Sequence, residues 1–187
     1  LLNKDTGLYL LRPKFSLWYI MALFIWRVIT PYVKRIPHYM LVSIAAGLLI
    51  GCSNMPNNFL SIPRVLVFYP FFLAGMNFDR ALVSKLRTPA KKTIAAISFA
   101  AFTAFLALAP ALRSCSVKIF YGRYNYDFLG QTFAEGMTIR LLCYGIGFFL
   151  TYALFCLVPE KKNRLSCMGE RTMAIYLFHG LLYSYIK

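Results

Sequence analysis

The sequence predicts an all-α protein, a polytopic bundle of helices that cross a lipid membrane. Of its 187 residues, 59% are hydrophobic and only 14% are charged, against about 25% charged residues in a typical soluble domain. The mean hydropathy of +0.60 is correspondingly high. One soluble core cannot bury this much apolar surface. Because helices satisfy their own backbone hydrogen bonds in lipid, and no segment alternates like a strand, the spans are predicted to be helical.

Six segments are apolar enough to be candidate spans, given that a full crossing takes about 20 residues and that tilt or shortening is tolerated. They are residues 15–33, 39–53, 60–78, 93–112, 137–158 and 172–187. The chain reads as a single transmembrane domain over residues 1–187. Because it starts with Leu-Leu and stops within an apolar run, we expect it to be part of a longer protein.

The loops between these spans predict their orientation. If the spans alternate, one set of loops carries 11 Lys and Arg residues and the other set carries 6. The richer set, which includes residues 79–92 and 159–171, is predicted to face the cytoplasm by the positive-inside rule. The N-terminal residues and the loop 113–136 are then predicted to lie outside.

Composition excludes several classes of function. The formal charge is +15, but the basic residues fall between apolar runs and no basic helix or RNA-binding aromatic motif accompanies them, which argues against nucleic acid. The five cysteines show no CxxC spacing, so we expect neither a metal site nor a disulfide framework. Catalytic motifs of soluble enzymes, such as HExxH or a glycine-rich phosphate loop, do not occur in the sequence.

Four polar residues lie within the predicted spans and are the first candidates for a site. Arg64 and Arg140 lie a few residues inside spans that enter from the outer side, Arg27 lies near the inner end of the first span, and His179 lies in the last. Each arginine could instead extend to the headgroups, and His179 could simply bond a neighbouring helix. Trp18 could belong to an interfacial aromatic belt.

The stretch IPRVLVFYPFFLAGM contains Arg64 and two prolines. An arginine in hydrocarbon costs at least ~2.5 kcal/mol and rarely persists there without a partner or a function. Helical spacing places Arg64, Phe68 and Phe71 on one face, which would suit a sugar or an acyl chain. Pro70 cannot donate to the carbonyl of Leu66, so a kink and a free acceptor facing a cavity are expected.

Three motifs in the same order resemble the membrane acyltransferase 3 family, especially its fucose 4-O-acetylase-like branch. SLWYIMALFIWRVITPYV is similar to that branch's LWFLxALFxWR, SIPRVLVFYPFFLAGM to its lSRxxxFFPFFLLG, and MGERTMAIYLFHG to its lGxxTxxIYLxHG. The resemblance implies about ten helices around a cavity in the plasma membrane. It also implies transfer of an acyl group, usually acetyl from acetyl-CoA, to a hydroxyl of a carbohydrate, with no bound cofactor.

The family's histidine general base lies in a first helix ending in GH, and a second motif resembles FHMPxFxFxSG; neither occurs in this chain. The catalytic base is therefore expected in helices that precede this chain. Relatives with WSLSVEEQFY carry a carboxylate where this chain has Leu23, so carboxylate-assisted catalysis from this helix is not expected.

The sequence is thus interpreted as the C-terminal part of an O-acyltransferase that acts on a cell-surface or lipid-linked carbohydrate. Arg64 and Arg140 would lie near the acceptor and Arg27 nearer the thioester, while the basic cytoplasmic loops could attract the phosphates of CoA. The alternatives are a carrier or flippase for a sugar or lipid-linked glycan, and a structural membrane subunit. Acyl-CoA-dependent transfer by the full-length protein separates the first function from both.

Overall fold

The computed structural model describes residues 17–53, 60–79, 88–108 and 117–157, together with Gly169, Thr172 and Tyr176. Every regular element in these ranges is a helix, which confirms the all-α class for this part of the chain. In order, the elements are α1 (Leu17–Val33), α2 (Tyr39–Leu49), the 3-10 turn η1 (Ile50–Cys52), α3 (Ile62–Met76), α5 (Pro89–Leu108), the 3-10 turns η2 (Val117–Tyr121) and η3 (Asp127–Leu129), and α7 (Phe133–Leu157).

The main core lies between α1 and α3. Ala22 and Trp26 of α1 pack against Val65, Tyr69 and Leu73 of α3, and all five are buried. The indole nitrogen of Trp26 donates a hydrogen bond of 2.9 Å to the carbonyl of Val65. Because a buried indole N–H needs an acceptor, this bond fixes the two helices in register as well as filling the space between them.

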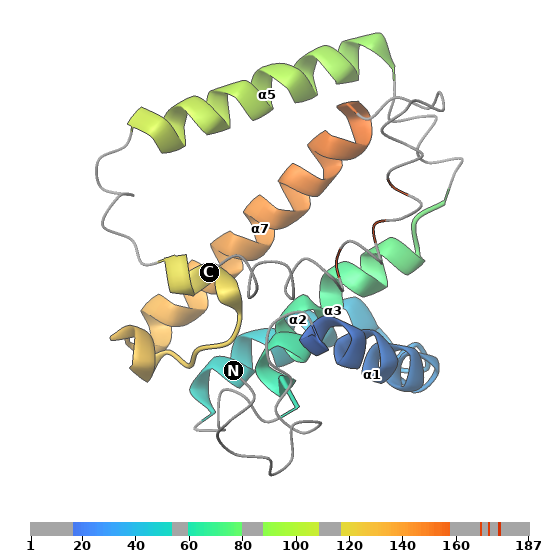
Figure 1. The fold of residues 1–187 in the computed structure, drawn as a ribbon, viewed down its shortest axis with the longest axis vertical. Coiled ribbons are helices and arrows are strands. Elements are labelled where there is room, and N and C mark those ends of the chain that lie inside the picture. Colours follow the sequence, from blue (N-terminus) through green and yellow to red (C-terminus); the bar gives the residue numbers. More distant parts are fainter. Residues whose placement is uncertain are drawn as a thin grey trace, which may run out of the picture.

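Helix α7 packs against the α1–α3 group along its first half and beside α5 along its second half (Figure 1). In the first half, Tyr144 donates 2.9 Å to the carbonyl of Val67. A Cβ on Gly47 of α2 would overlap that hydroxyl, so the glycine is what allows the close approach. In the second half, the buried contact consists of Ala153 and Cys156 with Ala95 of α5.

Two helices, α5 and α7, are long and apolar enough to cross a membrane. In the core helix of a soluble protein, most residues of such a segment would be buried. Here only 6% of the residues in the most apolar stretch of α5, and 22% of those in the most apolar stretch of α7, are buried. Their exposed apolar faces therefore fit a lipid environment. Helices α1, α2 and α3 are apolar but shorter, so the described residues contain two candidate spans by length and composition, and the larger count of six stays a prediction.

Helix boundaries differ from the predicted spans at two starts. The sequence predicts residues 89–92 to lie in a basic loop, but α5 already begins at Pro89. Proline is well suited to the first turn of a helix, which explains the earlier start. Helix α7 begins at Phe133 because Thr132 and Glu135 form a capping box, in which the backbone N–H of Thr132 donates 3.0 Å to the Glu135 carboxylate. The predicted span 172–187 lies outside the described residues, apart from Thr172 and Tyr176.

Candidate functional site

Three of the residues predicted for the site meet where α1 and α3 begin. The guanidinium of Arg64 lies 4.9 Å from the ring centroid of Trp18, and the Trp18 and Phe68 rings are 5.8 Å apart. A cation over an indole face is an attractive arrangement that strengthens when water is excluded. Arg64 is only partly buried, so its side chain remains partly accessible while the Trp18 ring lies against the cation.

Phe71 lies on the same face of α3 as Arg64 and Phe68, but its side chain is at the interface with another helix. Its ring stacks on Phe148 of α7 at 4.5 Å, and a Cβ on Gly147 would come within 2.7 Å of it. The carbonyl of Leu66, which Pro70 cannot bond, lies 3.2 Å from the position of a Cβ on Gly47. The predicted free acceptor therefore faces helix α2, where the absence of a side chain leaves room for it.

The segment between η2 and η3 covers the beginning of α3, and the key residue is Gly122. Its φ is +60°, a left-handed conformation that favours glycine. A Cβ at this position would lie 2.9 Å from Val67 and 3.2 Å from the Phe68 ring. Glycine thus brings the backbone against α3 and places Arg123 near Arg64, close enough for their positive charges to interact.

Arg123 was not among the residues that the sequence analysis selected. Its guanidinium lies 5.4 Å from the ring centroid of Tyr124, and its Nε is buried without a hydrogen-bond partner in the described structure. The available signal was a basic residue directly after a glycine in a tyrosine-rich loop. That signal was too weak because the sequence alone does not show which helix the loop covers.

Arg140 has its donors occupied. Nη1 donates 3.2 Å to the carbonyl of Gly47, Nη2 donates 3.0 Å to the carbonyl of Tyr124, and the guanidinium lies 4.7 Å from the Tyr126 ring. The side chain is buried, so it does not extend to the headgroups. It joins α7, α2 and the loop that carries Arg123.

Tyr126 completes this junction. Its hydroxyl donates 2.7 Å to the carbonyl of Leu48, and its backbone N–H donates 2.8 Å to that of Gly51. A Cβ on either Gly51 or Gly136 would overlap the ring. Burial raises the pKa of the Tyr126 hydroxyl, and the nearby charge of Arg140 opposes this only partly.

Further aromatic rings extend this surface along the loop. Tyr124 and Phe128 stack at 4.5 Å with an interplanar angle of 9°, and the ammonium of Lys118 lies 5.3 Å from the Phe128 ring centroid. Phe128 and Tyr121 are exposed. Flat, exposed rings next to cations form a surface suited to a polar ligand with apolar faces, such as a carbohydrate.

The remaining predicted residues lie elsewhere. Arg27 is exposed on α1, directly after the buried Trp26. His179 lies outside the described residues, although Tyr176 contacts Tyr19 of α1 with ring centroids 5.5 Å apart. The cluster therefore contains Trp18, Arg64 and Phe68 from the prediction, with Arg123 and Tyr124 added by the structure.

Contacts at the ends of the helices fall into two groups. The beginning of α3 and the segment that follows α2 both contact residues 117–132, which were predicted to lie on one side of the membrane. On the opposite side, Asn77 at the end of α3 donates 2.8 Å to the Tyr39 hydroxyl at the start of α2. Phe78 stacks on Phe155 near the end of α7 at 4.5 Å.

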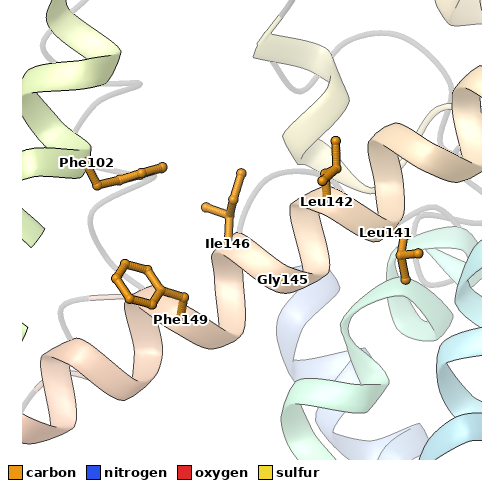
Figure 2. A pocket seen from close by; sticks show the side chains of 6 residues that line it. All are labelled: Phe102, Leu141, Leu142, Gly145, Ile146 and Phe149. Atoms are coloured by element: carbon orange, nitrogen blue, oxygen red, sulfur yellow. The ribbon is translucent and has the colours of Figure 1, made fainter. Parts of the chain in front are cut away.

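A cavity of about 330 Å³ lies between α5 and α7. Figure 2 shows its lining, which includes Phe102 from α5 and Ile146 and Phe149 from α7. None of the lining side chains is polar. The cavity is suited to a hydrocarbon chain and offers nothing for acid–base chemistry.

In the described residues, no group of three or more His, Cys, Asp or Glu side chains could hold a metal ion. The cluster at the beginning of α3 supplies positive charge and aromatic surface. It can bind and orient an anionic or polar group, while the base that a hydroxyl nucleophile requires does not come from the cluster itself.

Comparison with known proteins gives one match. Residues 4–187 match the acyltransferase 3 family, which is described as an acyltransferase domain. No curated protein and no solved structure matches the chain. Because the match covers nearly the whole chain, the chain belongs to this family, and it is a transferase that acts as an acyltransferase.

Proposed function

Starting from this family membership, we propose that the protein transfers an acyl group, acetyl in the first instance, from acyl-CoA to a hydroxyl of a cell-surface carbohydrate or its lipid-linked precursor. The observation that carries the acceptor assignment is the contact of Arg64 with Trp18, next to Phe68. Aromatic faces beside a cation match the chemistry of a sugar that carries or develops negative charge. The three ordered motifs favour the fucose O-acetylase-like branch within the family.

Acyl transfer to a hydroxyl needs a base for the hydroxyl proton and positive charge for the oxyanion that develops on the acyl carbonyl. Arg64 is proposed to supply positive charge on the acceptor side, where it binds an anionic or oxyanionic group of the reacting species. Its planar guanidinium can hold two oxygens at once, which an ammonium cannot do. The base is proposed to come from a histidine outside this cluster, and His179 is proposed to support the cavity wall.

The proposed setting is the plasma membrane, crossed by six spans of this chain. The acyl-CoA would be used on the side of the basic loops, near Arg27, and the acceptor would bind at the Arg64 cluster on the other side. The exposed apolar faces of α5 and α7 support contact with lipid. The six spans and their sidedness can be tested by labelling introduced cysteines near position 87 from outside intact cells, where no labelling is expected.

The central experiment measures acyl-CoA-dependent acylation by the full-length protein in membranes. We expect Arg64→Lys and Arg64→Ala to reduce kcat/KM strongly, by about 100-fold, since a charge-assisted bidentate contact contributes up to about 3 kcal/mol. Arg35→Lys is the matched control, because Arg35 also lies over a ring, that of Tyr32 at 5.8 Å, in an exposed turn. Near-full activity of Arg64→Lys would reduce Arg64 to an interfacial anchor.

A carrier for a sugar or lipid-linked glycan could use the same cluster as part of its path. Transport requires no acyl-CoA, so the two functions separate in one assay. Proteoliposomes that accumulate the glycan without acylating it would favour the carrier, whereas acylation that depends on acyl-CoA supports the transferase.

A further inference from the structure

Arg64 and Arg123 are two cations close enough to interact electrostatically, and no described carboxylate acts on Arg64 to balance them. The groups that act electrostatically on Arg64 are Arg123 and three tyrosines, and no acidic residue is among them in the described structure. Two like charges at partly buried positions repel each other and lose hydration. Such an arrangement is stabilised when an anion binds between them.

The described acidic side chain nearest in the loop, Asp127, is exposed at the start of η3. Glu135 is used in the cap of α7, where its carboxylate accepts from the Thr132 hydroxyl at 2.9 Å. Lys118 adds a third positive charge over the Tyr124 ring at 6.0 Å. Among the described residues, cations therefore lie on both the helix side and the loop side of the cluster.

Arg123 has one donor that no described residue satisfies. Its Nε is buried and has no hydrogen-bond partner in the described structure, although buried polar groups in native proteins nearly always have one. The backbone that carries it is fixed, since Gly122 packs on α3 and the next carbonyl, of Tyr124, accepts from Arg140. The Arg123 side chain therefore extends from a backbone that is already held in place, which lowers the cost of ordering it around an anion.

We propose that Arg64 and Arg123 together form an anion site that binds a phosphate group of the acyl acceptor. A carboxylate carries one negative charge and is matched by one guanidinium, whereas the pyrophosphate that links a lipid to a carbohydrate carries a negative charge on each of its phosphates and can be matched by two guanidinium groups. The site lies where α1 and α3 begin, beside exposed rings, and therefore suits a lipid-linked phosphate. This inference rests on the proposed acceptor side of the transferase, and it can be tested without any acyl transfer.

The test uses Trp18 as the reporter, because its ring lies against Arg64. The full-length protein in uncharged detergent is titrated with farnesyl phosphate, and tryptophan fluorescence is recorded. The same titration of Trp18→Phe identifies the part of the signal that belongs to Trp18. We expect a saturable change with farnesyl phosphate and none with farnesol, which has the same chain without the phosphate.

Arg123→Gln is expected to raise the Kd for farnesyl phosphate by about 10- to 100-fold, the loss of one charge-assisted contact. Arg35→Gln, at an exposed arginine that also lies over a ring, should leave the Kd unchanged. An unchanged Kd in Arg123→Gln, or equal binding of farnesol, would overturn the proposal. Circular dichroism of each variant shows whether it is folded, and Arg123→Lys, which keeps the charge, should bind more tightly than Arg123→Gln.

Competition distinguishes the possible sources of the phosphate. Inorganic phosphate is expected to compete only weakly, because it lacks the chain that contacts the aromatic rings. Nanodiscs containing phosphatidylglycerol should compete less than farnesyl phosphate at equal concentration. Equal competition would make the site an anchor for membrane headgroups and overturn the acceptor assignment. Absence of acyl transfer with intact farnesyl phosphate binding would instead reject the proposed function alone.

Discussion

The two halves of α7 make contacts of opposite kinds. The first half is tied to its neighbours by Arg140 and Tyr144, which donate to main-chain carbonyls of α2, α3 and the loop. The second half meets α5 through Ala153 and Cys156, with small side chains and an apolar cavity nearby. Polar bonds between segments are directional, whereas small-residue packing tolerates some sliding.

This difference indicates which part of the molecule must be positioned accurately. The directional contacts surround the loop that carries Arg123 and Tyr124, and they hold it against the beginning of α3. The α5 contact positions none of the described residues of the cluster. The hydrogen-bonded half of α7 therefore supports the site, and the apolar half mainly holds α5.

The largest expected effect is at the glycines around Tyr126. Gly51→Ala and Gly136→Ala each place a methyl group in the space of the Tyr126 ring, and overpacking of this kind costs about 3 kcal/mol where backbone on both sides is fixed. Unfolding free energy in mixed detergent micelles measures the loss.

The matched control is Gly145→Ala on the same helix, since a Cβ there meets nothing within 4 Å. It should be neutral or stabilising by about 0.5–1 kcal/mol, because alanine favours the helix. Equal destabilisation by Gly136→Ala and Gly145→Ala would show that the Tyr126 junction is not tightly packed.

Arg140→Met should have the next largest effect. The substitution removes the donors of the Gly47 and Tyr124 carbonyls, and an unsatisfied buried acceptor costs about 1–3 kcal/mol. Because the loop loses its tie to α7, farnesyl phosphate binding at the cluster should weaken as well. Arg35→Met, at an exposed position, is the control for simple loss of a positive charge. Stability loss with unchanged phosphate binding would separate the junction from the site.

Ala153→Leu examines the other half of α7 and should have a smaller effect. Ala153 is fully buried against α5, so a larger side chain overpacks the contact, but α5 can shift to relieve it at a cost of about 1–2 kcal/mol. Phosphate binding should remain at the level of the unmodified protein. Leu154→Ala, next to it and exposed, provides the lipid-facing control. A loss of phosphate binding in Ala153→Leu would mean that the two halves of α7 are coupled.

Hydrophobic runs predicted the elements well, because a continuous apolar run leaves a strong signal in the sequence whether or not it is long enough to cross a bilayer. Five of the six predicted spans coincide with helices to within a few residues. The starts that differed, at Pro89 and Phe133, both carry local signals: a proline suited to a first turn, and the Thr132–Glu135 capping box. Boundaries of this kind can be read from short motifs.

The site was only partly predictable. Arg64 stood out because an arginine in an apolar run is costly, and helical spacing placed Phe68 beside it. Arg123 did not stand out, since it belongs to a loop whose position depends on Gly122 packing against a helix about 55 residues earlier in sequence. Contacts of that range follow from the folded chain, and periodicity within one segment carries no information about them.

Tyr126→Phe gives the smallest effect at neutral pH and adds a dependence on pH. Loss of the hydroxyl bond to the Leu48 carbonyl should cost about 1 kcal/mol.

Burial raises the pKa of Tyr126 above its usual value of 10.0, so the folded state holds this proton more tightly than the unfolded state. The corresponding stability is complete below pH 10 and is lost as pH rises through the raised pKa. The unmodified protein should therefore lose stability above pH 10 more steeply than Tyr126→Phe, while Tyr121→Phe, an exposed tyrosine in the same loop, serves as the control. Unfolding curves at pH 8 to 11 measure this difference, and parallel losses in the unmodified protein and Tyr126→Phe would contradict the burial of this hydroxyl at the junction.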